Sequence, residues 1–283
     1  MGGETGVRMA ALHSNAEIFA ANRATGHIAL SVAALEGRTR RKLVREDGSL
    51  RVRFPNAAPE ALEAVIVNTG GGMTGGDRFA IDIALEAGAS LIAGTAAAEK
   101  VYRSNGPDAE MTVRLDLAEG ARLAWLPQET ILFDRARLLR RIDVDLAPGA
   151  SLLMAEAVVF GRAAMGEFMT EGHVSDHWRV RRNGKLIYAD TARLDGAIAD
   201  KLGQAAVMAG GIAFATVLCA PGGEDQLAAV RALGETFKSE GGISAWNGIA
   251  VVRLCAKDGA TLRQDLVAVL GALGAQVPRL WSQ

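Results

Sequence analysis

A seven-residue phrase that occurs three times limits the folds open to this chain. It has the form Leu-x-x-Gly-Ala-x-Leu, and its copies occupy residues 85–91, 117–123 and 146–152. The glycines of the three copies are Gly88, Gly120 and Gly149, so the period is 32 and then 29 residues, which lies in the range of stacked supersecondary units. A turn is therefore expected at the same place in each of three successive units.

The segments that flank these turns alternate between apolar and other residues, as in 79–85, 113–117 and 142–146. Such alternation is typical of strands with one buried face. Each unit is interpreted as strand, tight glycine turn, strand. Because one hairpin cannot bury its apolar face alone, the units are expected to stack. The predicted fold is mainly β: a β-helix-like superhelix of stacked strand pairs with a repeat of about 30 residues. A conventional β-sandwich is the structural alternative.

The last hundred residues contain three further signals. Asn183-Gly184 lies between two alternating segments and predicts a hairpin with a type I′ turn. Residues 225–238 and 261–273 have apolar residues at helical spacing, so two helices are expected near the C-terminus, with a strand at 249–255 between them. The uncharged stretch 202–223 contains glycines and a proline, and we interpret it as a buried strand after a glycine turn rather than a membrane span.

No linker is visible between these parts of the chain. We therefore expect a single domain over residues 1–283, with a β body at about 25–220 and a strand-helix-strand-helix closing region at about 221–283.

The composition argues against several classes of partner. The chain has 31 Lys and Arg against 32 Asp and Glu, so no overall charge favours nucleic acid or an anionic membrane. Cys219 and Cys255 each lie in an apolar run, which indicates buried reduced thiols and a reducing compartment. Residues 1–6 carry no visible targeting signal, and a cytoplasmic location is expected.

A glycine loop at residues 68–77 contains the pattern G-x-G-x-x-G. Its glycines are Gly70, Gly71, Gly72, Gly75 and Gly76. A dinucleotide site needs a helix after such a loop, but residues 78–85 alternate as a strand, so we reject that interpretation. Two interpretations stay open: a structural loop that allows close backbone approach, or a loop that lines a passage or contact surface together with Thr74 and Asp77.

Several motifs that carry chemistry are missing from the sequence: the phosphate-binding G-x-x-x-x-G-K-[ST] loop, the G-x-S-x-G elbow and a Cys/His cluster with zinc spacing. His173 and His177 form H-x3-H, but their flanks indicate loop and strand, so we expect them to be solvated or in a hairpin. No tight metal site and no tightly bound cofactor are expected.

Polar residues recur at similar places in successive repeats. Glu99 and Lys100 are followed, one repeat later, by Gln128 and Asp134, and Glu156 lies in the third unit. One interpretation is salt bridges between stacked strands; the other is that these residues line a shared internal surface. The basic runs at 38–45 and 135–141 are expected to be solvated faces.

An enzyme is the competing class. A β-rich hydrolase or transferase could use Glu99 with Lys100, or Glu129 with Asp134, as acid and base. Neighbours on a strand point to opposite faces, which disfavours the first pair. No catalytic residue is assigned.

Several unusual segments, in this order, resemble the urease accessory protein UreD family, called UreH in some organisms. The resemblance rests on the glycine loop, Thr-Ala-Ala-Ala-Glu-Lys-Val-Tyr-Arg at 95–103, and Trp-Leu-Pro-Gln-Glu-Thr-Ile-Leu-Phe-Asp at 125–134. Phe-Gly-Arg at 160–162, Gly166-Glu167 and Pro-Arg-Leu-Trp at 278–281 are also similar to the family.

The resemblance implies a non-enzymatic chaperone that, with UreF and the GTPase UreG, binds apo-urease and helps deliver nickel to its active site. It implies a β-helix-like fold with two helices, a place in a multiprotein complex that allows for a dimer, and an internal tunnel thought to carry nickel. Neither nucleic acid nor membrane is an expected partner. The C-terminal helices are our expected contact for UreF.

Carried onto this sequence, the resemblance implies a polar nickel route near seven residues. They are Thr74, Asp77, Glu99, Lys100, Gln128, Asp134 and Glu156. Ni²⁺ held by several imidazoles or thiolates leaves slowly, whereas carboxylates, carbonyls and water hold it more weakly and allow transfer. The chain offers many of the second kind, which favours transient passage of Ni²⁺. A pure scaffold that bridges its partners without conducting nickel stays open as an alternative.

Overall fold

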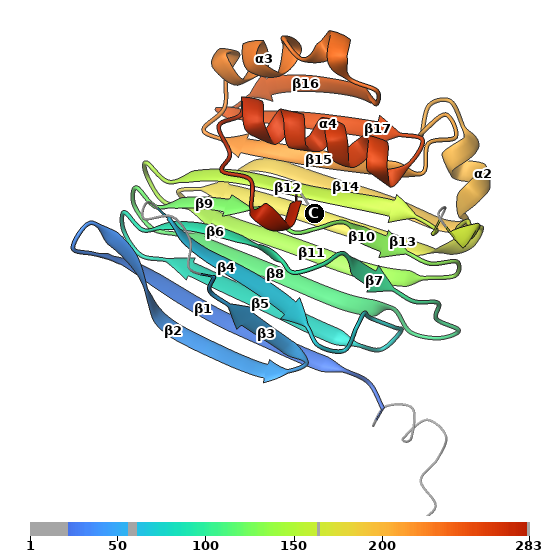
Figure 1. Ribbon diagram of the computed structural model, residues 1–283, viewed down its shortest axis with the longest axis horizontal. Coiled ribbons are helices and arrows are strands. Elements are labelled where there is room, and N and C mark those ends of the chain that lie inside the picture. Colours follow the sequence, from blue (N-terminus) through green and yellow to red (C-terminus); the bar gives the residue numbers. More distant parts are fainter. Residues whose placement is uncertain (1–21, 56–60, 163–164, 282–283) are drawn as a thin grey trace, which may run out of the picture.

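A computed structural model of the protein describes residues 22–55, 61–162 and 165–281. Residues 1–6, in which no targeting signal is visible, lie outside this part of the chain. The described residues form two β-sheets that face each other, with the strands stacked in near-sequence order from β2 at one end to β16 at the other (Figure 1). The fold is mainly β and solenoid-like, with about four turns.

The first sheet, called sheet A here, has seven strands within the described residues. Their order is β14 (Lys185–Ala197), β13 (Glu171–Arg182), β11 (Arg137–Leu146), β8 (Ala109–Leu117), β5 (Arg78–Leu85), β1 (Thr25–Leu35) and β2 (Arg38–Gly48).

The second sheet, called sheet B, faces it. Its order is β16 (Glu240–Trp246), β17 (Ile249–Ala256), β15 (Ala213–Ala220), β12 (Ser151–Phe160), β9 (Arg122–Trp125), β6 (Ser90–Thr95), β4 (Leu62–Asn68) and β3 (Leu50–Arg53). Off this path, the short β10 (Thr130–Leu132) pairs in parallel with β12 and with β7 (Glu99–Val101).

The repeated glycine turns are corners between the two sheets. The strand before each turn (β5, β8 or β11) lies in sheet A, and the strand after it (β6, β9 or β12) lies in sheet B; each pairs in parallel with its counterpart in the next repeat. The corners also stack: Gly88 N donates to Glu119 O (2.9 Å) and Gly120 N to Pro148 O (3.1 Å). The stacked repeat is confirmed, but the expected pairing within each unit as a hairpin is wrong. A glycine with positive φ turns the chain in either case, and only contacts between repeats decide the partner.

The space between the sheets is filled by alternate side chains of every turn. Ile81, Val113, Ile142 and Trp178 are in register across β5, β8, β11 and β13, and each is at most 4% exposed. Because the side chains of a strand alternate, every second residue of β11 points into this core. Arg140 is one of them, and it is 3% exposed.

The hairpin at Asn183-Gly184 is confirmed: β13 and β14 are antiparallel, and the two turn residues have φ values of 51° and 75°. The same device recurs at Asn247-Gly248, with φ values of 50° and 71°, where it joins β16 to β17. The closing region therefore contains one strand more than expected.

Two helices of the closing region agree with expectation in place and differ in length. α3 (Glu224–Arg231) ends well before residue 238 and is followed by a short 3₁₀ turn, Gly234–Thr236. α4 (Gly259–Ala272) begins at the cap residue Asp258, whose side chain accepts from Thr261 N. A further short helix, α2 (Ile198–Gly203), follows β14 and was not predicted.

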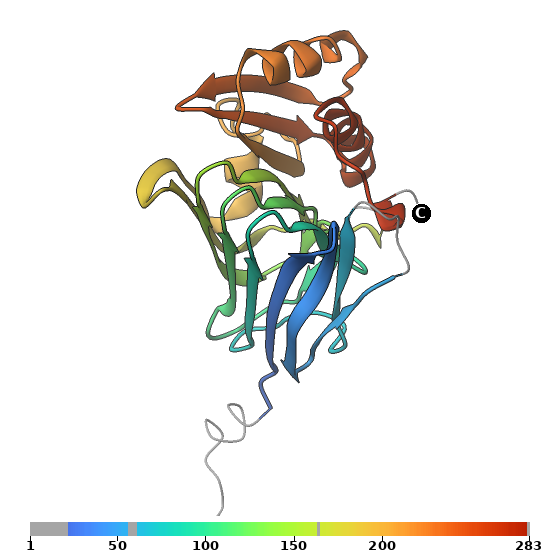
Figure 2. The same ribbon diagram turned by 90° about the vertical axis from the view of Figure 1, so that its left-hand side faces the viewer.

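Helix α4 lies on the outer face of sheet B, at the end of the molecule opposite β2 and β3 (Figures 1 and 2). Leu262, Leu266 and Val269 of α4 are fully buried in a second apolar cluster with residues of β15 and β17. The stretch 202–223, weighed above as a strand against a membrane span, contains β15, and none of the described helices is long and apolar enough to cross a membrane.

Candidate internal passage

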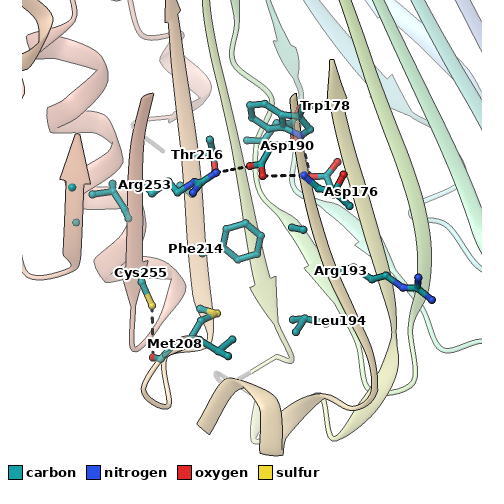
Figure 3. Close-up of a pocket in the computed structure, with 18 of the residues that line it drawn as sticks. Asp176, Trp178, Asp190, Arg193, Leu194, Met208, Phe214, Thr216, Arg253 and Cys255 are labelled. Atoms are coloured by element: carbon teal, nitrogen blue, oxygen red, sulfur yellow. Dashed lines mark hydrogen bonds and ion pairs between the residues drawn. The ribbon is translucent and has the colours of Figure 1, made fainter. Parts of the chain in front are cut away.

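Two cavities are relevant to the predicted route. The first, called the wide cavity, opens where the two sheets separate at the end of the stack. Its volume is about 620 Å³, and it lies between β14 of sheet A and β15, β17 and β16 of sheet B (Figure 3). Its lining includes Arg140, Glu156 and Asp176, which are all nearly fully buried, together with more exposed groups such as Asp190 and Arg253.

An ion pair joins the two sheets across this cavity. Arg253 of β17 donates to Asp190 of β14 at 2.7 Å, and the Tyr188 hydroxyl donates to the same carboxylate at 3.0 Å. Burial, together with the charge of Asp190, raises the pKa of Tyr188 to about 12. The hydroxyl therefore keeps its proton and its contact with Asp190 at neutral pH.

The smaller cavity, called the narrow cavity, lies inside the solenoid and has a volume of about 150 Å³. Residues of both sheets line it, among them Ile81 of sheet A and Trp125 of sheet B. At one side it reaches Glu99 and two residues of the glycine loop, Gly71 and Gly72. Among the described residues, only Arg140 and Glu156 line both cavities, so these two side chains stand where the cavities meet.

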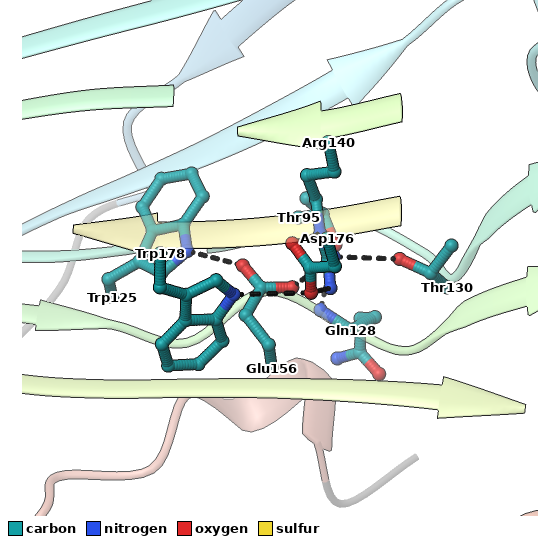
Figure 4. A network of polar contacts seen from close by, with 8 residues as sticks. All are labelled: Thr95, Trp125, Gln128, Thr130, Arg140, Glu156, Asp176 and Trp178. Carbon is teal, nitrogen blue, oxygen red and sulfur yellow. Dashed lines mark hydrogen bonds and ion pairs between the residues drawn. The ribbon is translucent and has the colours of Figure 1, made fainter. Parts of the chain in front are cut away.

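A cluster of buried charges occupies this meeting point (Figure 4). The Arg140 guanidinium donates to Asp176 through Nε (3.0 Å) and Nη2 (2.6 Å), and to Glu156 Oε2 through Nη1 (2.5 Å). Nη1 also reaches the Thr130 hydroxyl at 3.2 Å. Arg140, Glu156 and Asp176 come from β11, β12 and β13, so three strands of the fold must be in place to build the cluster.

Two tryptophans complete the cluster. Trp125 Nε1 donates to Glu156 Oε1 (2.8 Å), and Trp178 Nε1 donates to Asp176 Oδ2 (3.1 Å). Each carboxylate is thus held by the guanidinium on one side and by an indole on the other. With both carboxylates ionised, one positive and two negative charges leave this buried centre with a net charge of −1.

The pKa values in the cluster follow from burial and mutual attraction. Burial raises the pKa of the Glu156 carboxyl, while Arg140 and the Trp125 N–H oppose that rise. For the guanidinium, burial works against the charged form, but Asp176 and Glu156 outweigh it, and the pKa of Arg140 lies above its ordinary value. Arg140 therefore stays positively charged at any pH at which the protein is folded.

Four of the seven residues predicted for the polar route line the narrow cavity. They are Glu99, Lys100, Gln128 and Glu156. Glu99 accepts from Asn68 Nδ2 at 3.0 Å, and burial raises the pKa of its carboxyl to about 7. Gln128 is tied to the C-terminal segment, because its Nε2 donates to Leu280 O at 3.0 Å and its Oε1 accepts from Arg263 of α4.

The other three residues line neither cavity and hold loops together. Both carboxylate oxygens of Asp77 accept backbone N–H groups, from Ala24 and from Thr74, each at 2.8 Å. The Thr74 hydroxyl donates to Arg103 O at 3.2 Å. Asp134 accepts from the hydroxyl and the backbone N–H of Thr170, each at 2.7 Å, which ties β10 to the segment before β13.

The glycine loop has the close backbone contacts of the structural interpretation, whereas Thr74 and Asp77, expected to line a passage or contact surface with it, line neither cavity. A Cβ on Gly72 would lie 2.7 Å from Lys100 O, and a Cβ on Gly75 would lie 2.3 Å from Pro107 O, so both positions need close backbone approach. Gly71 and Gly72 also line the narrow cavity. The loop leads into strand β5, which agrees with rejecting a dinucleotide site.

Sequence reasoning missed the centre of the cluster. Arg140 was placed in a solvated basic run, which is wrong for this residue although Arg141 is exposed. A signal was present: Arg140 stands in phase with Leu138, Ile142 and Val144 on the apolar side of β11. Asp176 stands in the same phase between Val174 and Trp178. A charge on the buried side of a strand indicates a buried partner.

The two residues of each acid and base pair in the enzyme alternative lie in different surroundings. Glu99 is half-buried beside the narrow cavity while Lys100 is exposed. Glu129 accepts from Arg263 through both of its oxygens, at 2.8 and 2.6 Å, whereas Asp134 binds Thr170.

Within the described residues no group of three or more His, Cys, Asp or Glu side chains is arranged to hold a metal ion.

The two histidines of the H-x3-H pattern have local partners. His173 contacts Asp195 at 3.1 Å, and His177 lies between the hydroxyls of Ser175 and Thr191. Both cysteines are free thiols; burial raises the pKa of Cys219 to about 12, and burial also raises that of the half-buried Cys255. Thiols protonated at neutral pH are poor metal ligands and poor nucleophiles.

Comparison with known proteins gives a consistent result. A family model described as UreD urease accessory protein matches residues 24–282. The chain is 54% identical to the urease accessory protein UreD of Rhodopseudomonas palustris strain BisA53, over 95% of this chain and 94% of that protein. It is 55% identical to UreD of strain HaA2, over 95% and 96% of the two chains, and 53% identical to UreD of Bradyrhizobium diazoefficiens, over 95% and 98%.

Proposed function

The chain belongs to the UreD family of urease accessory proteins, and from this membership we propose that it is a non-enzymatic chaperone that delivers nickel to apo-urease through its own interior. A role in urease maturation follows from the family. The passage of nickel, its route and the partners are the proposal. The observation that carries it is that two cavities share the side chains of one buried cluster, formed by a guanidinium and two carboxyl groups.

The two cavities supply the outline of a route through the solenoid. A cation would enter beside Glu99 and the glycine loop, pass Glu156 at the junction, and leave through the wide cavity past Asp190, or take the reverse direction. Carboxylates stand at the start, the middle and the far end of this path. In their ionised forms these groups lower the free-energy cost of moving a cation through a medium of low dielectric constant, and an approaching cation itself favours their ionisation.

The ligand chemistry along the path favours transfer over storage. Its oxygen ligands are carboxylates, amides and hydroxyls, which exchange Ni²⁺ faster than sets of imidazoles or thiolates, and the one cysteine among the described lining residues, Cys255, is a thiol whose pKa is raised by burial. Both carboxylates at the junction are already bound to Arg140. A cation in transit would therefore find partial coordination rather than a complete site.

The partners in this proposal are UreF, the GTPase UreG and apo-urease, in the cytoplasm and within a complex that allows for a dimer of this chain. The closing region supports a docking role, because α3 packs on β16 and α4 at the far end of the stack, where a partner could reach it.

The test is urease activity in cells that carry the urease operon, with this gene deleted and then restored, at low and high nickel. Restoring the wild-type gene should restore activity. Glu156→Gln should lower activity several-fold at low nickel and much less at high nickel, because it removes a carboxylate charge at the junction. Glu119→Gln is the matched control, since Glu119 is exposed at a corner of the solenoid.

Two results would contradict the proposal. Normal urease maturation after deletion at both nickel levels would remove the maturation role. Full activity of Glu156→Gln at low nickel, with an unchanged amount of the protein, would remove the internal route and favour the pure scaffold.

A further inference from the structure

Burial of the Arg140 guanidinium costs free energy. A guanidinium that is 3% exposed loses its hydration, and a buried ion cluster is often no more stable than apolar side chains of similar volume. The inward position of β11 that it occupies is flanked by Leu138 and Ile142, and an aliphatic residue there would continue the core. The position therefore carries a positive charge where packing alone would favour an apolar side chain.

The guanidinium stands in the place that suits a small cation. It lies between a Glu156 oxygen at 2.5 Å and two Asp176 oxygens at 2.6 and 3.0 Å, with the Thr130 hydroxyl at 3.2 Å. Three carboxylate oxygens and one hydroxyl oxygen therefore surround the guanidinium, each within hydrogen-bond distance of one of its nitrogens. These are the oxygen donors that bind divalent cations without thiolate or imidazole.

The location of this space adds a second observation. Arg140 and Glu156 are the only described residues that line both the narrow and the wide cavity. An arrangement whose sole purpose was to hold three strands in register would not need to stand at the junction of two cavities. Here the charged side chain fills the boundary between them.

We propose that Arg140 is the gate of the passage and the built-in occupant of a latent divalent-cation site formed by Glu156, Asp176 and Thr130. The cation takes the place of the guanidinium when the arginine side chain swings into one of the two cavities. The returning guanidinium then competes for the same carboxylates and releases the cation. The identity of the cation as Ni²⁺ rests on the proposed function; the site itself rests on the contacts above.

The gate explains why the wild-type protein would not trap the metal. Without the guanidinium, the two carboxylates would keep their indole hydrogen bonds but have no counter-charge, and a divalent cation could supply that charge. With it, each carboxylate already has a charged hydrogen-bond donor, so a cation must displace an existing interaction. Removing Arg140 should thus create tight binding where the wild type shows weak binding.

The test compares nickel binding by the purified full-length chain and three variants, using equilibrium dialysis against NiCl₂. Arg140→Gln should bind about one Ni²⁺ per chain, at least about tenfold more tightly than the wild type, because the cation supplies the counter-charge that the two buried carboxylates have lost. Arg141→Gln, which removes the neighbouring exposed arginine of the same strand, should bind like the wild type. The double variant Arg140→Gln/Glu156→Gln should lose the gain.

Thermal unfolding provides a second measurement. Nickel should raise the melting temperature of Arg140→Gln and leave that of Arg141→Gln unchanged, since a ligand that binds only the folded state stabilises it. If Arg140→Gln does not fold even with nickel present, Arg140→Lys is measured in its place. Its ammonium cannot hold Asp176 through two parallel bonds, so it should still bind nickel about threefold or more tightly than the wild type.

The results that would overturn the gate are distinct from those that would overturn the nickel route. Equal nickel binding by the wild type and Arg140→Gln, or by the wild type and Arg140→Lys where the first does not fold, removes the inference whatever urease does. Tight binding by Arg140→Gln in a chain that still matures urease fully at low nickel retains the cation site and removes the passage.

Discussion

Strand β11 carries two neighbouring arginines in opposite surroundings. Arg140 points between the sheets, is 3% exposed and contacts two carboxylates, whereas Arg141 points away from the core and is exposed on the outer face of sheet A. That outer face bears charges in ladders such as Asp82 beside Arg114, with 3.4 Å between Oδ1 and Nη1. The same residue type thus occurs in water on one side of the strand and in a low-dielectric interior on the other.

The difference teaches where charge has consequences in this fold. Water screens the outer charges, and exposed ion pairs contribute little to stability. The inner charges are unscreened, so each depends on the presence of its partner. The effect of a charge-changing substitution on the free energy of unfolding should therefore depend on how deeply the charge is buried rather than on the residue type.

The largest expected effect separates the two arginines directly. Without nickel, Arg140→Gln should lower the free energy of unfolding by about 3–5 kcal/mol, because Glu156 and Asp176 would be left buried without a counter-charge. Arg141→Gln should change it by less than about 0.5 kcal/mol. Urea unfolding followed by circular dichroism measures both.

A neutral cluster sharpens this result. The triple variant Arg140→Gln/Glu156→Gln/Asp176→Asn has no buried charge at the junction and should recover much of the lost stability. Equal stability of Arg140→Gln and Arg141→Gln would mean that the interior around β11 is solvated well enough to screen the charges, and the comparison would fail.

The next effect concerns the contact between α4 and the solenoid. Arg263 of α4 donates to both oxygens of Glu129, to Gln128 and to Trp281 O (3.1 Å), and its guanidinium lies over the Trp281 ring at 5.2 Å. Arg263→Ala would leave the buried Glu129 carboxylate without its partner. We expect a loss of about 2–3 kcal/mol in the free energy of unfolding.

The matched control for this helix contact is Arg231→Ala, which removes an exposed arginine at the end of α3. It should change stability by less than about 0.5 kcal/mol. If Arg263→Ala were as mild as this control, the half-buried guanidinium would belong with the solvated charges of the outer face rather than with those of the interior.

Glu99 provides an intermediate case, in which pH changes the charge. Its pKa is raised by burial from 4.5 to about 7, so between these values the folded protein binds more protons than the unfolded chain. Stability therefore falls as pH rises from about 5 to 7, and above pH 7 the full penalty applies. Glu99→Gln should remove this slope and be about 1–3 kcal/mol more stable than the wild type at pH 8.

Urea unfolding at pH 5 and pH 8 checks this expectation, with Glu119→Gln as the exposed control. The expectation fails if the free energy of unfolding changes by the same amount between pH 5 and pH 8 in the wild type and in Glu99→Gln. That result would mean that the Glu99 carboxyl has an ordinary pKa and is well solvated.

How far the sequence anticipates this molecule depends on the range of the interactions involved. The glycine corners, the Asn183-Gly184 hairpin and α4 follow from local signals, namely a period, a turn dipeptide and a helical spacing. The partner of each strand does not, because strands that flank one corner could pair with each other or with the next repeat. Strand β16 was missed although Asn247-Gly248 carries the same turn signal as Asn183-Gly184.

The candidate site divides in the same way. Glu99, Gln128 and Glu156 were expected at an internal surface and line the narrow cavity. Asp77 and Asp134 have the same chemistry but bind backbone N–H groups of neighbouring loops, which depends on distant segments such as Ala24 and Thr170. The burial of Arg140 could be predicted from its phase in β11. Its partners lie on β12 and β13, so they could be identified only once the fold was known.

The smallest expected effect tests the outer face itself. Asp116 of β8 and Asp145 of β11 are direct neighbours in the parallel ladder, and the pKa of Asp116 is raised by partial burial, by Asp145 and by Asp82. Asp145→Asn should relieve this repulsion and raise the free energy of unfolding at pH 7 by at most about 0.5 kcal/mol at low salt. The gain should vanish in about 0.5 M NaCl, where charges are screened within a few ångströms. The nickel-free loss in Arg140→Gln should persist in the same salt, because buried charges are screened much less. If both effects disappeared with salt, burial would not be what distinguishes the two faces of β11.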